Sequence, residues 1–171
     1  MSSANAAPDT PEGATVRAAT VDDVATIYAL LVELADATGL GHKLLSSKDD
    51  LIRHGFSKAP AFEVLLAEQD GAALGMSLYF YNYSSWRGRL GVYIQDLVVE
   101  RHARGLGIGG LLVRETARRA KKRGATHLRL SVEHDNRAAH RFYESIGVNP
   151  AASERILEAD GAAFERLATA P

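Results

Sequence analysis

The residues whose types and spacing point most clearly to a chemical role form a glycine-rich run at the start of a predicted helix. Residues 105–110 read Gly-Leu-Gly-Ile-Gly-Gly and follow shortly after a long apolar segment that ends at Val99. Glycines at such a place let anionic oxygens approach bare backbone N–H groups, and the positive end of the helix dipole adds attraction. The run therefore predicts an anion cradle that suits phosphate groups.

Basic side chains gather beside this loop. Residues 101–123 hold eight Lys or Arg and one Glu, a local charge of +7, whereas the whole chain has a formal charge of −1. On a helical wheel, four of these side chains share an arc of roughly 100°: Arg114, Arg118, Lys121 and Lys122. This stripe is either a solvated helix face or a contact for further phosphates of the same ligand.

Length and composition limit the remaining possibilities. With 171 residues, 46% of them hydrophobic, the chain suits one domain, which we place at residues 15–171. Residues 1–14 contain no large apolar residue after Met1 and are predicted to form a disordered tail. The near-neutral charge argues against nucleic acid as a partner. The absence of cysteine excludes disulfides, thiolate metal sites and cysteine nucleophiles.

We expect neither a membrane partner nor secretion. No apolar run approaches the roughly 20 residues that a membrane-spanning helix needs. The N-terminus lacks the positive start and apolar stretch of a secretion signal. A cytoplasmic protein is therefore expected.

The glycines also match the G-x-G-x-x-G fingerprint of dinucleotide-binding folds, and Glu133 follows Gly110 by 23 positions. In that fingerprint the glycines follow their strand almost at once and open a series of βαβ units. Here residues 101–104 intervene, and only one such unit follows. Nicotinamide binding is therefore the less favoured alternative.

Hydrophobic periodicity and turn residues predict the elements that position the loop. Helices are predicted at residues 20–38, 47–55, 108–123 and 137–145. Strands are predicted at residues 16–19, 62–68, 73–83, 90–99 and 126–132, with a last pair of strands between residues 148 and 168. Antiparallel strands followed by a strand–helix–strand unit indicate a mixed sheet flanked by helices.

Two linked motifs resemble the GNAT family of N-acetyltransferases. Residues 104–109, Arg-Gly-Leu-Gly-Ile-Gly, match the (Q/R)-x-x-G-x-(G/A) pattern whose backbone amides hold the pyrophosphate of acetyl-CoA in that family. Residues 136–147 resemble its N-x-x-A-x-x-F-Y-x-x-x-G segment. The similarity covers roughly residues 15–168. It is greatest to the diamine (spermidine/spermine) and thialysine acetyltransferases.

The resemblance implies an α+β fold of three layers. Its central sheet would be mixed and mostly antiparallel, splayed between the fourth and fifth strands and flanked by helices. The pantetheine arm of acetyl-CoA, the acetyl donor, would lie in the splay. The resemblance also implies a homodimer and requires no metal.

The resemblance further assigns roles to individual residues. Tyr143 lies where the family has the tyrosine that protonates the leaving thiolate, and an unperturbed tyrosine, with a pKa of about 10, keeps its proton at pH 7. The positions that match acetyl-CoA contacts are Leu97, Val98, Val99, Arg104, Gly105, Leu106, Gly107, Ile108, Gly109, Gly110, Asn136, Ala138 and Ala139.

The chain departs from the diamine enzymes at Gln95. Those enzymes have a glutamate there that is the proposed catalytic base, and an amide cannot take a proton from an ammonium group. Asp96, Glu133, His134 or water alone could take the role. Trp86, Gln95 and Glu133 are the candidates for contact with the amine, although the aromatic run that ends at Trp86 is also typical of strand packing.

The substrate class is less constrained than the reaction. Residues 36–43 hold one acidic residue, Asp36, and carry Lys43, so a dicationic polyamine would find less favourable charge than the likeness suggests. An amino acid, a thialysine-like compound, another small amine or a peptide amine remains open.

The favoured hypothesis is an N-acetyltransferase that moves the acetyl group of acetyl-CoA directly to the primary amine of a small molecule. Direct transfer agrees with the lack of cysteine and of the G-x-S-x-G and H-E-x-x-H motifs. Two alternatives are a protein or peptide N-acetyltransferase and a non-catalytic acyl-CoA sensor.

Overall fold

One five-stranded sheet forms the centre of the molecule. The computed structural model describes residues 12–151 and 154–169. The strands lie in chain order: β1 (Thr15–Ala18), β2 (Glu63–Gln69), β3 (Ala72–Ser84), β4 (Arg89–Val99) and β5 (Leu128–Leu130). The first three pairings are antiparallel and β4–β5 is parallel. The expected mixed, mostly antiparallel sheet is confirmed.

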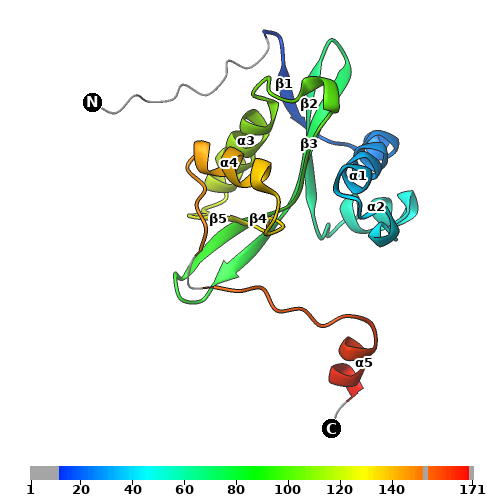
Figure 1. Cartoon of the computed structure of the whole chain (residues 1–171), viewed down its shortest axis with the longest axis vertical. Coiled ribbons are helices and arrows are strands. Elements are labelled where there is room, and N and C mark those ends of the chain that lie inside the picture. The colour runs from blue at the N-terminus through cyan, green and yellow to red at the C-terminus, as the bar shows by residue number, and fades with distance from the viewer. Residues whose placement is uncertain (1–11, 152–153, 170–171) are drawn as a thin grey trace.

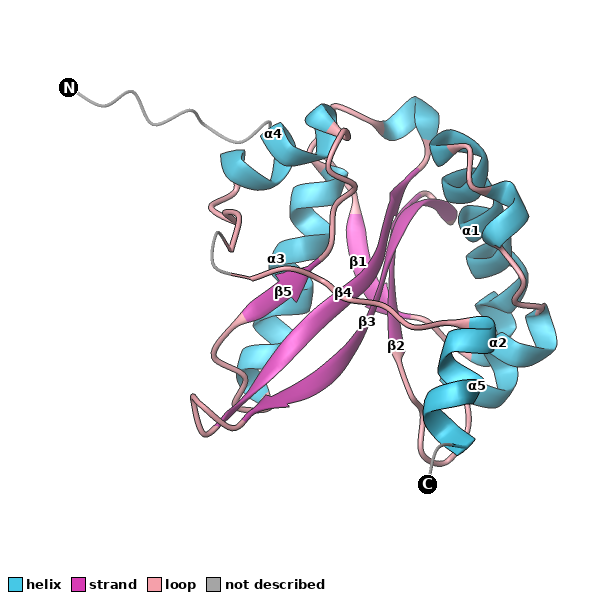
Figure 2. Ribbon diagram, turned by 60° about the horizontal axis from the view of Figure 1, so that its bottom comes forward, coloured by secondary structure: helices cyan, strands magenta, loops and turns pink. Residues whose placement is uncertain are grey.

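Helices cover both faces of the sheet (Figures 1 and 2). One face carries α1 (Val24–Thr38) and α2 (Lys48–Gly55), and the other carries α3 (Ile108–Lys122) and α4 (Arg137–Ser145). These helices lie where the sequence predicts them. Ser47 caps α2, because its hydroxyl accepts the N–H of Asp50 and Ser47 N–H donates to the Asp50 carboxylate. Within the described residues, no helix combines the length and apolar character needed to cross a bilayer.

The sheet separates two hydrophobic clusters. Successive side chains of a strand point to opposite faces, so the neighbours Leu65 and Leu66 are both fully buried but in different clusters. Leu65 packs in the cluster of the α3 side, with Leu112. Leu66 packs in the cluster of the α1 side, with Ile27. Two filled interfaces make the three-layer arrangement that the resemblance implies.

A β-bulge interrupts β4 next to its last residues. Leu78 of β3 pairs with Asp96, whereas Tyr79 pairs with Ile94, which leaves Gln95 as the extra residue. Cross-strand pairs share a face, so Asp96 follows Leu78 to the α1 side. Bulges re-aim the side chains that follow them and concentrate near functional sites. The alternation of side chains in the sequence does not predict this bulge.

β4 and β5 separate soon after they meet. In the described part of the chain, Val92, Tyr93 and Ile94 pair with β5, and residues 95–99 of β4 continue without a neighbouring strand on that side. The splay between the fourth and fifth strands is therefore confirmed. β5 is also shorter than the predicted strand at residues 126–132.

The predicted last pair of strands is wrong. Residues 148–151 and 154–160 contain no strand, and α5 (Gly161–Thr169) follows. Alanines favour a helix, and Asp160 C=O accepts the N–H groups of Ala163 and Phe164 in its first turn. Most of the predicted tail, residues 1–11, lies outside the described residues, and the domain limits stay a prediction.

Candidate functional site

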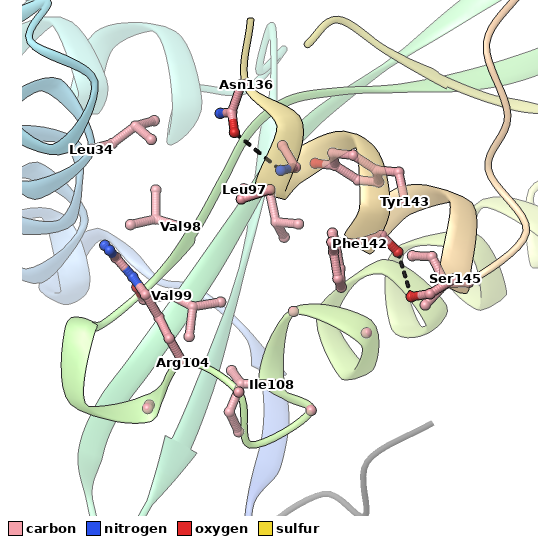
Figure 3. Close-up of a pocket in the computed structure, with 18 of the residues that line it drawn as sticks. Leu34, Leu97, Val98, Val99, Arg104, Ile108, Asn136, Phe142, Tyr143 and Ser145 are labelled. Carbon is pink, nitrogen blue, oxygen red and sulfur yellow. Dashed lines mark hydrogen bonds between the residues drawn. The ribbon is translucent and has the colours of Figure 1, made fainter. Parts of the chain in front are cut away.

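A cavity of about 640 Å³ opens at the splay (Figure 3). Its walls come from the end of β4, the glycine loop, the start of α3, α4 and the end of α1. Every residue predicted to contact acetyl-CoA lines this cavity except Leu106, and Tyr143 lines it as well. The structure thus brings together two motifs that lie about 30 residues apart in the sequence.

The glycine loop presents a row of free backbone donors. Gly105 and Gly107 have φ of +80° and +77°, the left-handed region that only glycine enters at low cost. The first N–H of α3 with a backbone acceptor is that of Leu111, which donates to Gly107 C=O over 3.0 Å. Among the described residues, no hydrogen bond uses the N–H groups of Gly105, Gly107, Ile108, Gly109 and Gly110. These five donors lie at a helix N-terminus, which is the arrangement that an anion cradle requires.

One arginine of the basic stripe reaches the cavity. Arg114 lines it, and its guanidinium packs over Gly110. Arg118, by contrast, pairs with Glu115, which also accepts from Arg119. The stripe is therefore divided between Arg114 at the glycine loop and an outer part in which Arg118 is paired with Glu115.

α4 is fixed at its start by the predicted asparagine. Asn136 Oδ1 accepts the N–H of Ala139 over 3.0 Å, a helix N-cap (Figure 3). At the other end, the Phe142 ring packs on Gly109, where a Cβ would lie 3.1 Å from it. The contact between these two residues seats α4 against the cradle.

Tyr143 projects from α4 into the same cavity. Its ring lies 4.9 Å from that of Phe142, and Figure 3 shows its hydroxyl on the side of Leu97 and Asn136. Burial raises the pKa of Tyr143 to about 12. The phenol therefore stays protonated at neutral pH and can donate a proton.

Gln95 and Asp96 lie just before the part of β4 that lines the cavity. Gln95 is exposed at the bulge, and Asp96 is half-buried on the α1 side. Burial raises the pKa of Asp96 above the ordinary value of an aspartate. A carboxyl group with a raised pKa is a stronger base once it is ionised.

The other predicted substrate contacts are dispersed. Trp86 is 99% exposed at the tip of the β3–β4 hairpin, where it lines a second cavity of about 500 Å³ with His127 and Arg129. Glu133 and His134 are exposed in the loop before α4. Neither Trp86 nor Glu133 lines the cavity of Tyr143. Within the aromatic run, Phe80 stacks on Tyr93 at 5.2 Å, which is strand packing.

Sequence reasoning misses the contribution of α1. Leu34, Ala37 and Thr38 line the cavity, and their spacing of three to four residues puts them on one face of the helix. That spacing is readable from the sequence. What it cannot show is that this face meets the splay rather than the solvent.

The family model described as "Acetyltransferase (GNAT) family" matches residues 27–148. Thialysine N-epsilon-acetyltransferase of Bos taurus is 31% identical over 154 residues, which cover 85% of this chain and 87% of the relative. Aminoalkylphosphonate N-acetyltransferase of Salmonella typhimurium is 33% identical and covers 75% of this chain and 80% of the relative.

Solved structures share the fold. An integron cassette protein from the mobile metagenome of V. cholerae superposes with a TM-score of 0.78 at 23% identity, over 92% of this chain and 99% of its own. The family model spans well over half of the chain, and its range includes the glycine loop and α4. The chain belongs to the GNAT family of acetyltransferases.

Proposed function

We propose that this chain is an acetyl-CoA-dependent N-acetyltransferase that acetylates the primary amine of a small molecule. The observation that carries the proposal is the joint placement of five free backbone N–H donors and a protonated tyrosine in one cavity. The N–H donors are suited to bind a pyrophosphate group, and the tyrosine is suited to give a proton to a leaving group. Bound acetyl-CoA would supply the acetyl group as a thioester.

The residues that line the cavity fit acetyl-CoA along its length. The cradle at Gly105–Gly110 would bind the pyrophosphate, with Arg114 nearby as a positive charge. The unpaired side of β4 at Leu97–Val99 would receive the pantetheine arm and orient the carbonyl of the thioester. No covalent intermediate on the protein is needed, since the amine attacks the thioester directly.

Tyr143 is the proton donor in this proposal. As the C–S bond breaks, the thiolate gains negative charge inside a partly buried cavity, where unpaired charge is costly. The phenol donates its proton to that sulfur, and the proton that the attacking nitrogen loses as it becomes an amide restores the phenol.

Asp96 is our candidate for the base that prepares the amine. At neutral pH the amine enters as ammonium and must lose a proton before it can attack. The adjacent Gln95 cannot accept it, whereas Asp96 lies one residue further along β4, and burial raises its pKa. Because Gln95 is exposed at the bulge, we propose that a water molecule from solvent relays the proton.

We propose an amino-acid-like or thialysine-like amine that also carries an acidic group. Two relatives are named for thialysine and for an aminoalkylphosphonate, which both combine these groups. In this chain, His42 and Lys43 follow α1, whose last turn lines the cavity. The positive charge of Lys43 suits a carboxylate or phosphonate better than the second ammonium group of a polyamine.

Gln95 favours one competing reading. An intact cradle without the expected glutamate suits a non-catalytic module that binds acyl-CoA and senses it. A peptide N-acetyltransferase is a further alternative within the same family. The amine panel described below separates all three.

We also propose a homodimer, supported by the C-terminal arm, residues 154–169. Figure 1 shows α5 away from the sheet and its helices. The large apolar side chains of the arm are 58–92% exposed: Ile156, Leu157, Phe164 and Leu167. Exposed apolar surface of this kind marks an interface, and a second copy of the chain is the partner we propose. The expected cytoplasmic location stays a prediction.

The proposed reaction predicts thiol release from acetyl-CoA when an amine is present. In a panel of thialysine, ornithine, aminoalkylphosphonates, spermidine, spermine and a short peptide, we expect the highest kcat/KM on an amine with an acidic group. Binding of acetyl-CoA without turnover on any amine would support the sensor instead. Faster turnover of spermidine or spermine than of every acidic amine would contradict the proposed substrate class.

Tyr143→Phe removes only the hydroxyl. We expect kcat to fall by about 10²- to 10⁴-fold, the usual contribution of general acid catalysis. The dissociation constant of acetyl-CoA, measured by calorimetry, should change less than threefold. An unchanged kcat would exclude Tyr143 as the acid.

Asp96→Asn removes the proposed base but keeps the shape of the side chain. In the unmodified protein, kcat/KM should fall as pH falls through the pKa of Asp96, which burial raises above the ordinary value. The variant should lose this acidic limb and at least tenfold in kcat/KM at neutral pH. An identical pH profile in both proteins would assign the base to water or another residue.

The dimer proposal predicts a mass of twice 18.4 kDa by light scattering. Leu157→Asp, on the arm, should shift the mass toward that of one chain. The substitution would place a charge in the proposed interface, and the cost of burying that charge would destabilise the dimer. Ser2→Asp, at the other terminus, is the control. A wild-type mass of one chain at micromolar concentration would refute the dimer.

A further inference from the structure

The glutamate at position 33 lies outside both motifs, yet it bonds to the segment that leads into the glycine loop. Glu33 Oε1, on α1, accepts the backbone N–H of Arg101 over 3.0 Å and a guanidinium N–H of Arg104 over 3.2 Å. The neighbouring carboxyl group of Glu33 also raises the pKa of Glu100. One side chain thus accepts hydrogen bonds from two residues of the segment 101–104.

The first of these bonds acts as a helix cap from another part of the chain. Residues 101–103 form a 3-10 turn whose preceding residue, Glu100, offers no side-chain cap. Glu33 accepts from the N–H that opens the turn, a donor for which the described residues provide no backbone acceptor. The turn is therefore held against α1.

The second bond fixes the arginine of the glycine motif. Arg104 donates through Nε to Val99 C=O over 2.9 Å and through Nη2 to Glu33. Figure 3 shows its guanidinium directed toward α1, the helix that carries Leu34. The guanidinium therefore links the end of β4 to α1, while Gly105 follows it directly in the chain.

We propose that Glu33 is a positioning residue for acetyl-CoA, which holds the turn at residues 101–104 so that the N–H groups of the glycine loop point into the cavity. The inference rests on the proposed function and adds a residue to the same site. Since backbone donors bind an anion only in the right orientation, loss of the restraint should weaken the pyrophosphate contact. The chemistry at Tyr143 should be affected much less.

The test compares two acetyl donors on Glu33→Ala. Acetyl-CoA carries the pyrophosphate and S-acetyl-pantetheine does not. We expect the dissociation constant of acetyl-CoA to rise about tenfold, with kcat at saturation within twofold. The kinetics with S-acetyl-pantetheine should stay within twofold of the wild-type protein. Glu33→Gln keeps an oxygen for the N–H of Arg101 but loses the charge opposite Arg104. Its dissociation constant for acetyl-CoA should therefore lie between those of the wild-type protein and Glu33→Ala.

Two further measurements separate positioning from general stability. Hydrogen exchange of the free protein should speed up at the amides of residues 101–110 in Glu33→Ala. The matched control is Glu68→Ala on β2, whose carboxylate is as shielded as that of Glu33, 20% against 21% exposed, and is bonded to Arg17. This control should lower the melting temperature but leave acetyl-CoA binding and exchange in the loop unchanged.

An unchanged dissociation constant for acetyl-CoA in Glu33→Ala would overturn the inference. So would an equal loss of affinity for both acetyl donors, which would indicate a general effect on the fold. If the wild-type protein binds no acetyl-CoA, the proposed function is wrong. The hydrogen-exchange comparison of the free proteins then still decides whether Glu33 holds the loop.

Discussion

The separation of β5 from β4 after Ile94 is the constraint on which the rest of the site depends. Buried backbone N–H and C=O groups need partners, so a strand inside a sheet that loses its neighbour must find a substitute. One is found within the chain, where Arg104 donates to Val99 C=O. The remainder of that side of β4 faces the cavity, which suits an extended ligand arm that can add amide hydrogen bonds of its own. The bulge at Gln95 lies at the start of this opening.

Electrostatics concentrates at the same place. The chain is nearly neutral, but residues 101–123 carry a charge of +7, and α3 directs its N-terminus at the cavity. Part of that charge is paired with carboxylates outside the segment, since Glu33 bonds to Arg104 and Glu63 bonds to Arg123. At the cavity, the five amide donors lie beside Arg104, which is paired with Glu33, and Arg114, which forms no salt bridge with the described residues. An anion would thus be bound mainly by oriented dipoles, whose placement requires a rigid loop, which is why the bonds from Glu33 matter.

Much of the fold and of the candidate site was predictable from short motifs in the sequence. The glycines, Asn136 and Tyr143 belong to two short motifs that resemble those of the GNAT family, and this resemblance was enough to predict that they lie together. Other features depend on packing between distant segments. The bulge at Gln95 depends on the register between β3 and β4. The direction of Arg104 depends on a carboxylate 71 residues away. The prediction of C-terminal strands is wrong because residues 154–160 contain no strand and the alanines after them favour the helix α5.

The central claim is that the splay and the glycine loop together form an acetyl-CoA site. The most direct test is a titration of the ¹⁵N-labelled protein with acetyl-CoA, followed by amide NMR. We predict that the resonances of Leu97–Val99 and of Gly105–Gly110 shift together and saturate at one equivalent, while those of β1 remain in place. Shifts confined to the second cavity around Trp86 and His127, or no shifts at millimolar acetyl-CoA, would contradict the account.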